Sequence, residues 1–228
     1  MIGIICAMSI EAEKLIEKIE NVKSTEQIAN MKYVAGTYAG KEVVVGISGI
    51  GKVSAALGAQ HMIMKYHPDF IINTGVAGSL SENLAICEVC ISTDVVQHDM
   101  DTTPIGDPKG LISGLNVIEI NADANIAKKL GECCDKLGIK YTFGRVASGD
   151  QFIADRKRKL EIIEDFKATC CEMEGAAIGQ ACFLNNVPFV VLRSISDSFN
   201  DSEGMEYAQF SKIAADNSAK IIDTFLRA

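Results

Sequence analysis

Long apolar runs are absent from this sequence. No stretch approaches the ~18 consecutive apolar residues that a membrane-spanning helix needs, so we expect no segment to cross a membrane. Basic residues are also scarce: 22 Lys and Arg stand against 30 Asp and Glu, and the formal net charge is −8. An acidic surface repels phosphates, so we expect no nucleic-acid or anionic-membrane partner. The densest basic run, DRKRK at 155–159, is flanked by acids and is typical of a solvated helix face.

A basic N-terminal region is missing too. MIGIICAMSIEAE starts with apolar residues, but acidic residues already occur from Glu11 onward. This pattern is not typical of a signal peptide. Cys87 and Cys90 form one C-x-x-C without the second pair that a tetrahedral zinc site requires. The eight cysteines lie in apolar surroundings, a pattern of reduced, buried thiols rather than disulfides. We therefore expect a cytoplasmic protein without a structural metal.

Repeats, low-complexity linkers and breaks in composition are likewise missing. A chain of 228 residues suffices for one sizeable core and is short for two. We therefore expect a single domain over residues 1–228. Its longest stretch without periodicity is 99–116, and long loops in compact domains are usually functional or disordered.

The apolar segments that are present predict an α/β fold. IGIICAM, DFIINTGVAG and PFVVLRSISD are continuous apolar runs of the kind found in strands buried on both faces, and SIEAEKLIEKIE after the first run is helical in pattern. MKYVAGTYAGKEVVVGIS predicts an antiparallel hairpin, so the sheet is mixed. We expect three α/β/α layers around a central mixed, twisted sheet. The further amphipathic helices are predicted at 52–66, 122–138, 154–165, 175–185 and 206–226.

Two glycine-rich stretches are candidates for ligand contact. GISGIGKV at 46–53 matches the start of a phosphate-binding P-loop, but Val53 stands where magnesium binding needs a hydroxyl. A glycine turn that opens a helix near a ligand is the better interpretation, since Gly49 and Gly51 allow close approach. NTGVAGS at 73–79 predicts a strand that ends in glycine-rich backbone, with either a ligand-binding or a purely conformational role.

Acidic residues gather at the predicted strand ends. Glu11 lies in the first turn of a helix, where a simple capping role is an equal alternative. Asp150 fits an ordinary turn. Glu172, Glu174 and Asp197 follow apolar strands, and their convergence at one sheet edge would indicate a site. Such carboxyl groups suit hydrolysis at an anomeric carbon. One of them, protonated, assists the leaving group as an acid, and another, ionised, orients or deprotonates the attacking water.

Six motifs stand out along the chain. In order they are IGIICAMSIEAE, SGIGKVSAALGA, FIINTGVAGSL, VASGDQFI, EMEGAAIGQAC and NVPFVVLRSISD. Taken together, they resemble the motifs of the 5'-methylthioadenosine/S-adenosylhomocysteine nucleosidases, a family of the purine nucleoside phosphorylase and hydrolase superfamily. The resemblance runs almost from end to end.

The resemblance implies a catalytic assignment. Glu11 matches the glutamate that activates the attacking water, and Arg193 an arginine that helps to hold it. Asp197 matches the general acid that protonates the purine at N7, with Ser196 beside it to orient the carboxyl. This chemistry needs no metal or organic cofactor.

The same resemblance implies a set of substrate-binding residues. Phe152 would stack on adenine, Glu174 would hold the ribose hydroxyls with Met173 against the sugar, and Tyr207 would line the pocket for the 5' group. The remaining members of the set are Ile50, Val76, Ala77, Gly78, Ile153 and Glu172. The role of Glu172 stays open between a ribose contact and a supporting carboxylate.

The resemblance also implies a homodimer, with the 97–115 region near the partner's active site. Relatives often carry aromatic residues there, whereas this chain has Gln97, Ile105 and Asp107. The preferred 5' substituent therefore stays open among methylthioadenosine, S-adenosylhomocysteine, 5'-deoxyadenosine and aminofutalosine. We expect His98 and Asp99 to pair structurally.

Three other functions compete. A phosphorolytic purine nucleoside phosphorylase would need arginines around phosphate, but Asn73 stands where one is expected, and Glu11 beside an unpaired phosphate would cost several kcal/mol in a dry site. A P-loop nucleotide-binding protein would bind ATP or GTP with magnesium. A nucleoside-binding protein without activity would leave the acidic set unexplained.

Overall fold

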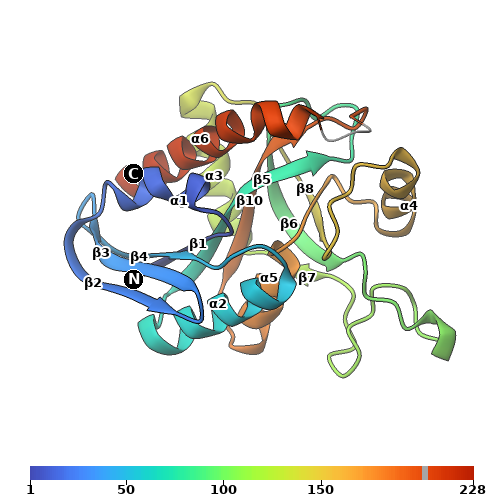
Figure 1. The fold of residues 1–228 in the computed structure, drawn as a ribbon, viewed down its shortest axis with the longest axis horizontal. Coiled ribbons are helices and arrows are strands. Elements are labelled where there is room, and N and C mark those ends of the chain that lie inside the picture. Colours follow the sequence, from blue (N-terminus) through green and yellow to red (C-terminus); the bar gives the residue numbers. More distant parts are fainter. Residues whose placement is uncertain (202–204) are drawn as a thin grey trace.

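The computed structural model describes residues 1–201 and 205–228, and within them ten strands join one mixed sheet (Figure 1). The strands are β1 (Ile2–Cys6), β2 (Glu20–Ile28), β3 (Met31–Tyr38), β4 (Lys41–Ile47), β5 (Phe70–Ser79), β6 (Val89–Gln97), β7 (Ile120–Asn121), β8 (Tyr141–Ser148), β9 (Cys170–Glu172) and β10 (Phe189–Asp197). The helices are α1 (Ser9–Ile16), α2 (Lys52–Tyr66), α3 (Ala124–Leu137), α4 (Arg156–Phe166), α5 (Gly175–Leu184) and α6 (Met205–Arg227).

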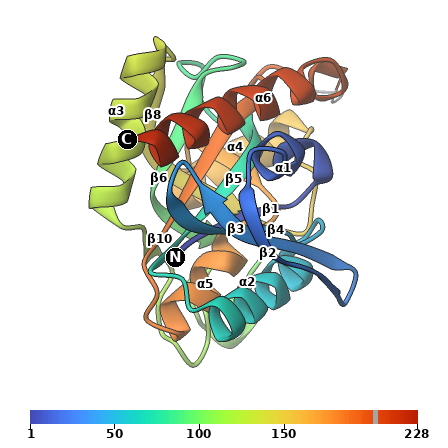
Figure 2. The same cartoon turned by 90° about the vertical axis from the view of Figure 1, so that its left-hand side faces the viewer.

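Helices cover both faces of the sheet, as the sequence predicts. One apolar cluster packs α2 and α5 against the sheet, and another packs α1, α3 and α6 against the opposite face. Figure 2 shows these two helical layers with the strands between them. The Val- and Ile-rich runs lie in the middle, and every residue of β10 is buried. The three-layer α/β/α arrangement is therefore confirmed.

Part of the sheet closes on itself. β10 pairs in parallel with β5 and antiparallel with β6, β6 continues to β8, β8 to β9, and β9 returns to β5. β1 extends the sheet from β5 to β4, β3 and β2. The last residue of β10, Asp197, lies opposite Gly78 near the end of β5, and the short β9 pairs with the last residues of both β5 and β8. These segments lie together at one mouth of the ring of strands.

The predicted hairpin is present as β3 and β4, and α2 occupies 52–66 as predicted. The first helix is shorter than predicted, because it ends at Ile16 and Glu20 already begins β2. β2 is a polar, largely exposed edge strand that pairs with β3. Its pairing lies in backbone hydrogen bonds, so no apolar pattern reveals it.

The two glycine-rich stretches behave differently. GISGIGKV is a turn that opens α2, with φ of +87° at Gly49 and +92° at Gly51, as expected. NTGVAGS is not a loop, because β5 continues through it to Ser79 and pairs with β10. That pairing places Gly75 opposite Arg193 and Gly78 opposite Asp197. These glycines leave room for the side chains of their partners.

The basic run at the start of α4 is not a uniformly solvated face. Lys157 is exposed, but Lys159 is fully buried, because backbone carbonyl groups surround its amine. The 99–116 region is irregular apart from a 3-10 turn at Thr103–Ile105 and a bridge between Ile112 and Val117.

All eight cysteines are free, and seven of them are buried. No helix within the described part of the chain is long and apolar enough to span a membrane. The single domain expected over 1–228 stays a prediction.

Candidate active site

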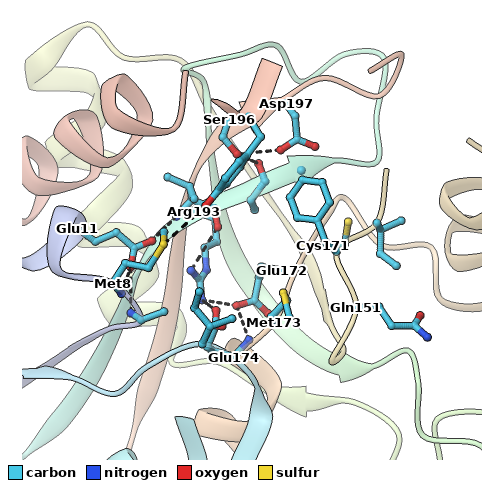
Figure 3. A pocket seen from close by; sticks show the side chains of 18 residues that line it. Met8, Glu11, Gln151, Cys171, Glu172, Met173, Glu174, Arg193, Ser196 and Asp197 are labelled. Carbon is cyan, nitrogen blue, oxygen red and sulfur yellow. Dashed lines mark hydrogen bonds and ion pairs between the residues drawn. The ribbon is translucent and has the colours of Figure 1, made fainter. Parts of the chain in front are cut away.

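One pocket opens at the mouth of the strand ring, between the ends of β5, β9 and β10 and the start of α1 (Figure 3). Every residue that the sequence predicts for the site lines it. Sequence reasoning missed four further lining residues, which are Ala7, Met8, Gln151 and Cys171. Each is a close chain neighbour of a predicted residue, so proximity in the chain is the signal that could have found them.

Glu11 is held rigidly at one side of the pocket. Its Oε2 accepts hydrogen bonds from the amides of Ala7, at 3.0 Å, and Met8, at 2.9 Å, and its Oε1 accepts one from the Val76 amide at 3.2 Å. Burial raises the pKa of Glu11, while Arg193 and these amides oppose the rise. Glu11 therefore both caps the start of α1 and lines the pocket.

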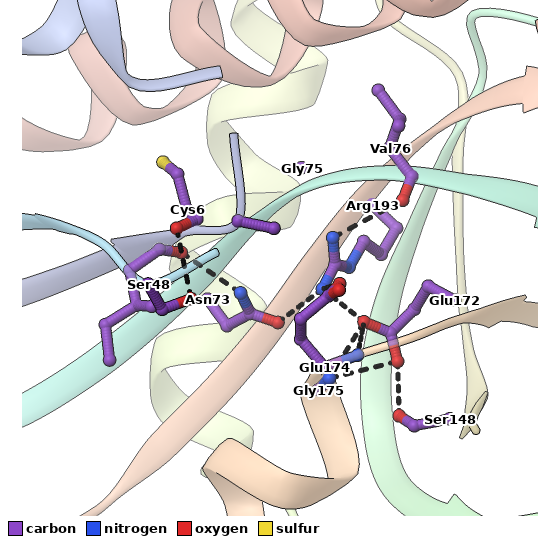
Figure 4. A network of polar contacts seen from close by, with 12 residues as sticks. Cys6, Ser48, Asn73, Gly75, Val76, Ser148, Glu172, Glu174, Gly175 and Arg193 are labelled. Atoms are coloured by element: carbon purple, nitrogen blue, oxygen red, sulfur yellow. Dashed lines mark hydrogen bonds and ion pairs between the residues drawn. The ribbon is translucent and has the colours of Figure 1, made fainter. Parts of the chain in front are cut away.

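Arg193 is the centre of a buried polar network (Figure 4). Its NH2 donates to Asn73 Oδ1 at 2.6 Å and forms an ion pair with Glu172, and its NH1 donates to the Val76 carbonyl at 3.3 Å. Burial lowers the pKa of Arg193, but the nearby carboxylates outweigh it and raise that pKa above its usual value. The Nε atom has no partner among the described residues.

Glu172 is saturated by protein donors. Its Oε2 accepts from the amides of Glu174, at 3.0 Å, and Gly175, at 2.8 Å, besides the ion pair with Arg193. Its Oε1 accepts from the Ser148 hydroxyl, whose oxygen in turn accepts from the Ala176 amide at 2.7 Å. With both oxygens occupied, this carboxylate anchors the turn that carries Glu174 at the start of α5.

Glu174 lies beside Glu172 but has a freer carboxylate. Its Oε1 accepts from the Gly51 amide at 2.9 Å, and its Oε2 lies 3.5 Å from Arg193 NH2. The glycine turn before α2 thus donates to a protein carboxylate. Burial, together with the charge of Glu172, raises the pKa of Glu174 to about 7.

Asp197 ends β10 on the far side of the pocket from Glu174 (Figure 3). Its Oδ1 accepts from the Ser196 hydroxyl at 2.9 Å, and a side chain at Gly78 would come within 2.6 Å of its Oδ2. Burial raises the pKa of Asp197, although the Ser196 hydrogen bond and Lys159 lower it in part. A carboxyl in this setting keeps its proton to a higher pH than an exposed aspartate does.

Aromatic and apolar side chains complete the pocket. The rings of Phe152 and Tyr207 meet edge to face, with centroids 5.3 Å apart. The Tyr207 hydroxyl lies 3.7 Å from Met8 Sδ, and Ile153 and Met173 also line the cavity. The pocket therefore has aromatic and apolar walls between acidic groups on opposite sides, which suits a ligand with an aromatic base and a polyhydroxyl group.

Polar residues beside the pocket are structural. Asp150 accepts from the Lys52 amide at 2.7 Å, in line with the turn role predicted for it. Asp99 pairs with Lys52 Nζ at 2.6 Å instead of the predicted His98. His98 is buried, with its Nδ1 3.4 Å from Arg158. No hydrogen bond or ion pair joins His98 to Asp99 among the described residues, although the charge of Asp99 acts on His98 and partly opposes the lowering of its pKa by burial. Within the described residues no cluster of His, Cys, Asp and Glu could hold a metal ion.

Known proteins are similar to this chain in both sequence and fold. A family model described as the phosphorylase superfamily matches residues 1–227. A 5'-methylthioadenosine/S-adenosylhomocysteine nucleosidase from Shewanella halifaxensis is 41% identical over 228 residues, which cover 99% of this chain and 98% of the relative.

Solved structures agree with the sequence matches. The nucleosidase of the same name from Neisseria meningitidis, in complex with methylthio-immucillin-A, superposes with a TM-score of 0.94 at 33% identity and covers 99% of this chain and 98% of its own. The futalosine hydrolase of Helicobacter pylori gives a TM-score of 0.92 at 32% identity, with 98% of this chain and 96% of its own covered.

The saturated carboxylate of Glu172 leads to a stability prediction. In Glu172→Gln an NH2 group replaces one acceptor oxygen. The buried Arg193 then loses its ion pair, and the new NH2 group faces N–H or O–H groups that donated to the carboxylate. We expect the free energy of unfolding to fall by about 3–5 kcal/mol, measured by urea denaturation. The control Glu161→Gln weakens only partly exposed ion pairs with Lys157 and Arg158, and it should change the free energy of unfolding by less than about 0.5 kcal/mol. Equal, small changes in both variants would contradict the anchoring role.

Proposed function

The chain belongs to the phosphorylase superfamily, and we propose that it hydrolyses the N-glycosidic bond of 5'-methylthioadenosine and S-adenosylhomocysteine to release adenine and a 5-thio-ribose. One observation carries the proposal: a single pocket holds a buried acid, Asp197, at one side and the carboxylates Glu11 and Glu174 at the others. The names of the relatives support the same substrates.

Departure of the base depends on Asp197. In the proposed reaction its carboxyl group donates a proton to N7 of adenine, so that the base leaves as a neutral molecule. The Ser196 hydroxyl orients the carboxyl through Oδ1 and leaves Oδ2 for the substrate. Phe152 and Ile153 supply the walls against which the base is held.

The attack by water depends on residues on the side of the pocket opposite Asp197. Glu174 binds the ribose hydroxyls, and in its ionised form its negative charge stabilises the positive charge that develops on the sugar. Glu11 accepts a proton from the attacking water, and a pKa raised towards neutrality suits a general base. Arg193 lines the pocket, and its Nε, which has no partner among the described residues, is the donor that we assign to that water. All of these steps use side chains and water alone.

Phosphorolysis is the alternative within the same superfamily. A phosphate would lie against Glu11, whose charge repels it, and Asn73 has its side-chain oxygen occupied by Arg193. Arg193 itself is neutralised by Glu172. The charges around the pocket therefore favour water over phosphate.

Adenine release provides the direct test of the function. The protein is incubated with methylthioadenosine, S-adenosylhomocysteine, 5'-deoxyadenosine or aminofutalosine, each with and without phosphate, and the free base is measured by chromatography. We expect release of the base from the two thio-nucleosides, at rates independent of phosphate. Strict dependence on phosphate would establish the phosphorylase alternative, and no release from any of the four would refute the proposal.

Replacement of the proposed acid tests the mechanism. Asp197→Asn keeps the shape of the side chain but has no acidic proton, so we expect kcat to fall by about 10²- to 10⁴-fold. The pH profile adds a second measurement: because the pKa of Asp197 is raised, activity is retained above the usual aspartate range and is lost as pH rises through that pKa. Normal turnover in the variant would remove Asp197 from its role.

We further propose that the protein is a cytoplasmic homodimer that acts in methionine salvage. Val53, Leu57 and Met64 are exposed on one stripe of α2, and Phe183 and Leu184 are exposed on α5, which packs against it. Exposed apolar surface of this kind marks interaction sites. The dimer would bring the 97–115 region of one protomer near the pocket of its partner.

A charge on that stripe tests the dimer. Leu57→Glu should shift the mass measured by sedimentation from dimer to monomer and lower kcat/KM, because the pocket loses its neighbouring protomer. Leu137→Glu, at a partly exposed position at the end of α3, is the matched control and should remain dimeric. A wild-type protein that sediments as a monomer would disprove the proposal.

A further inference from the structure

Lys159 is a buried cation that neither the proposed reaction nor the predicted basic helix face explains. Its side chain is 0% exposed, within α4. Its Nζ donates to the carbonyl oxygens of Ser198 and Asp201, each at 2.8 Å, and lies 3.4 Å from that of Phe199. Burying an amine of this kind is costly unless its hydrogen bonds are satisfied, and three converging carbonyls match the three donors of an ammonium group.

A second cation from the same turn of α4 holds the same segment. Arg156 NH1 donates to Asn200 Oδ1 at 2.7 Å, and its guanidinium lies 4.8 Å from the centre of the Phe199 ring. Lys157, between the two, is 85% exposed, and its one ion pair among the described residues is with Glu161, at 4.0 Å. Arg158 faces Glu161 and His98 instead. Arg156 and Lys159 are therefore the cations of this turn that hold segment 198–201.

The place of this segment in the chain connects it to the pocket. Residues 198–201 follow directly on Asp197, at the end of β10. α4 follows closely on Phe152 and Ile153, and Asp155 caps its first turn by accepting from the Arg158 amide at 3.0 Å. Lys159 thus joins two parts of the pocket wall that lie far apart in the sequence.

We propose that Lys159 is a positioning residue for Asp197: its amine holds segment 198–201 against α4 and so fixes the carboxyl that faces the substrate. The inference rests on the proposed function for its catalytic consequence, but the contact between α4 and the segment does not depend on it.

The charge of Lys159 also acts on Asp197, together with the other groups around that carboxyl. They are Ser196 on β10, Cys171 on β9, Asp201 in the segment, and Glu206 and Tyr207 on α6. Lys159 is the cation of this set and favours the ionised form of Asp197, whereas burial and the two acids favour the protonated form. Loss of the cation should therefore let Asp197 keep its proton to a higher pH.

Two variants separate the contact from the charge. Lys159→Met removes both, and Lys159→Gln removes the charge but keeps an N–H donor, which also covers the case in which the methionine variant does not fold. We expect kcat/KM for methylthioadenosine to fall by about tenfold or more in Lys159→Met, mainly through kcat, since Lys159 does not line the pocket. In Lys159→Gln the loss should be smaller, and the basic limb of the pH profile should move to higher pH. The matched control, Lys157→Met, should behave as the wild type.

Hydrogen exchange gives a measurement that needs no activity. The amides of 198–201 should exchange faster in Lys159→Met than in Lys157→Met, while those of β10 should not change. Wild-type protein that releases no adenine would refute the proposed function, and the exchange data would still test the contact. The inference fails if the Lys159 variants match Lys157→Met in kinetics and exchange, or if they lose activity by the same factor at every pH with unchanged exchange.

Discussion

The ion pair between Arg193 and Glu172 is the interaction on which the rest of the pocket depends. Both side chains are buried, so neither charge would be tolerated without the other. Arg193 reaches Val76 and Asn73 on β5, while Glu172 binds the amides at the start of α5. One pair of opposite charges thereby joins β5, β9, β10 and α5 at the mouth of the strand ring. Glu11 and Glu174 can then be buried nearby, because an arginine partly offsets their charge.

Hydrogen bonding divides the buried carboxyl groups into different chemical roles. Asp197 receives one hydroxyl hydrogen bond, whereas Glu172 receives amides, a hydroxyl and a guanidinium. The first environment raises the pKa of Asp197, and the second fixes the Glu172 side chain in place. The E-M-E sequence at 172–174 therefore contains two glutamates with separate duties: Glu172 fixes the turn, and Glu174 is left to meet a ligand.

The sequence predicts the layers of the fold well, because continuous apolar runs such as that of β10 report burial on both faces. It does not predict closure of the ring, which depends on the pairing of β5 with both β9 and β10. The short β9 and the polar β2 carry no periodic signal. The site residues that the family resemblance implies all line one pocket, because its motifs cover the ends of β5, β9 and β10 and the starts of the neighbouring helices. The burial of Lys159 could not be predicted, because nothing in DRKRK distinguishes a buried lysine from an exposed one. Lys159 is buried because backbone carbonyl groups of segment 198–201, distant in the sequence, accept hydrogen bonds from its amine.

Cys171 bears on how small molecules could be designed against this pocket. Its thiol lines the cavity and is an obvious target for inhibitors that form a covalent bond with sulfur. Burial raises the pKa of Cys171 to about 12, with a contribution from the charge of Asp197. The nucleophilic thiolate is therefore almost unpopulated at neutral pH, and alkylating groups would react slowly. Tight ligands for this site have to gain their affinity from reversible contacts with the carboxylates and the aromatic wall.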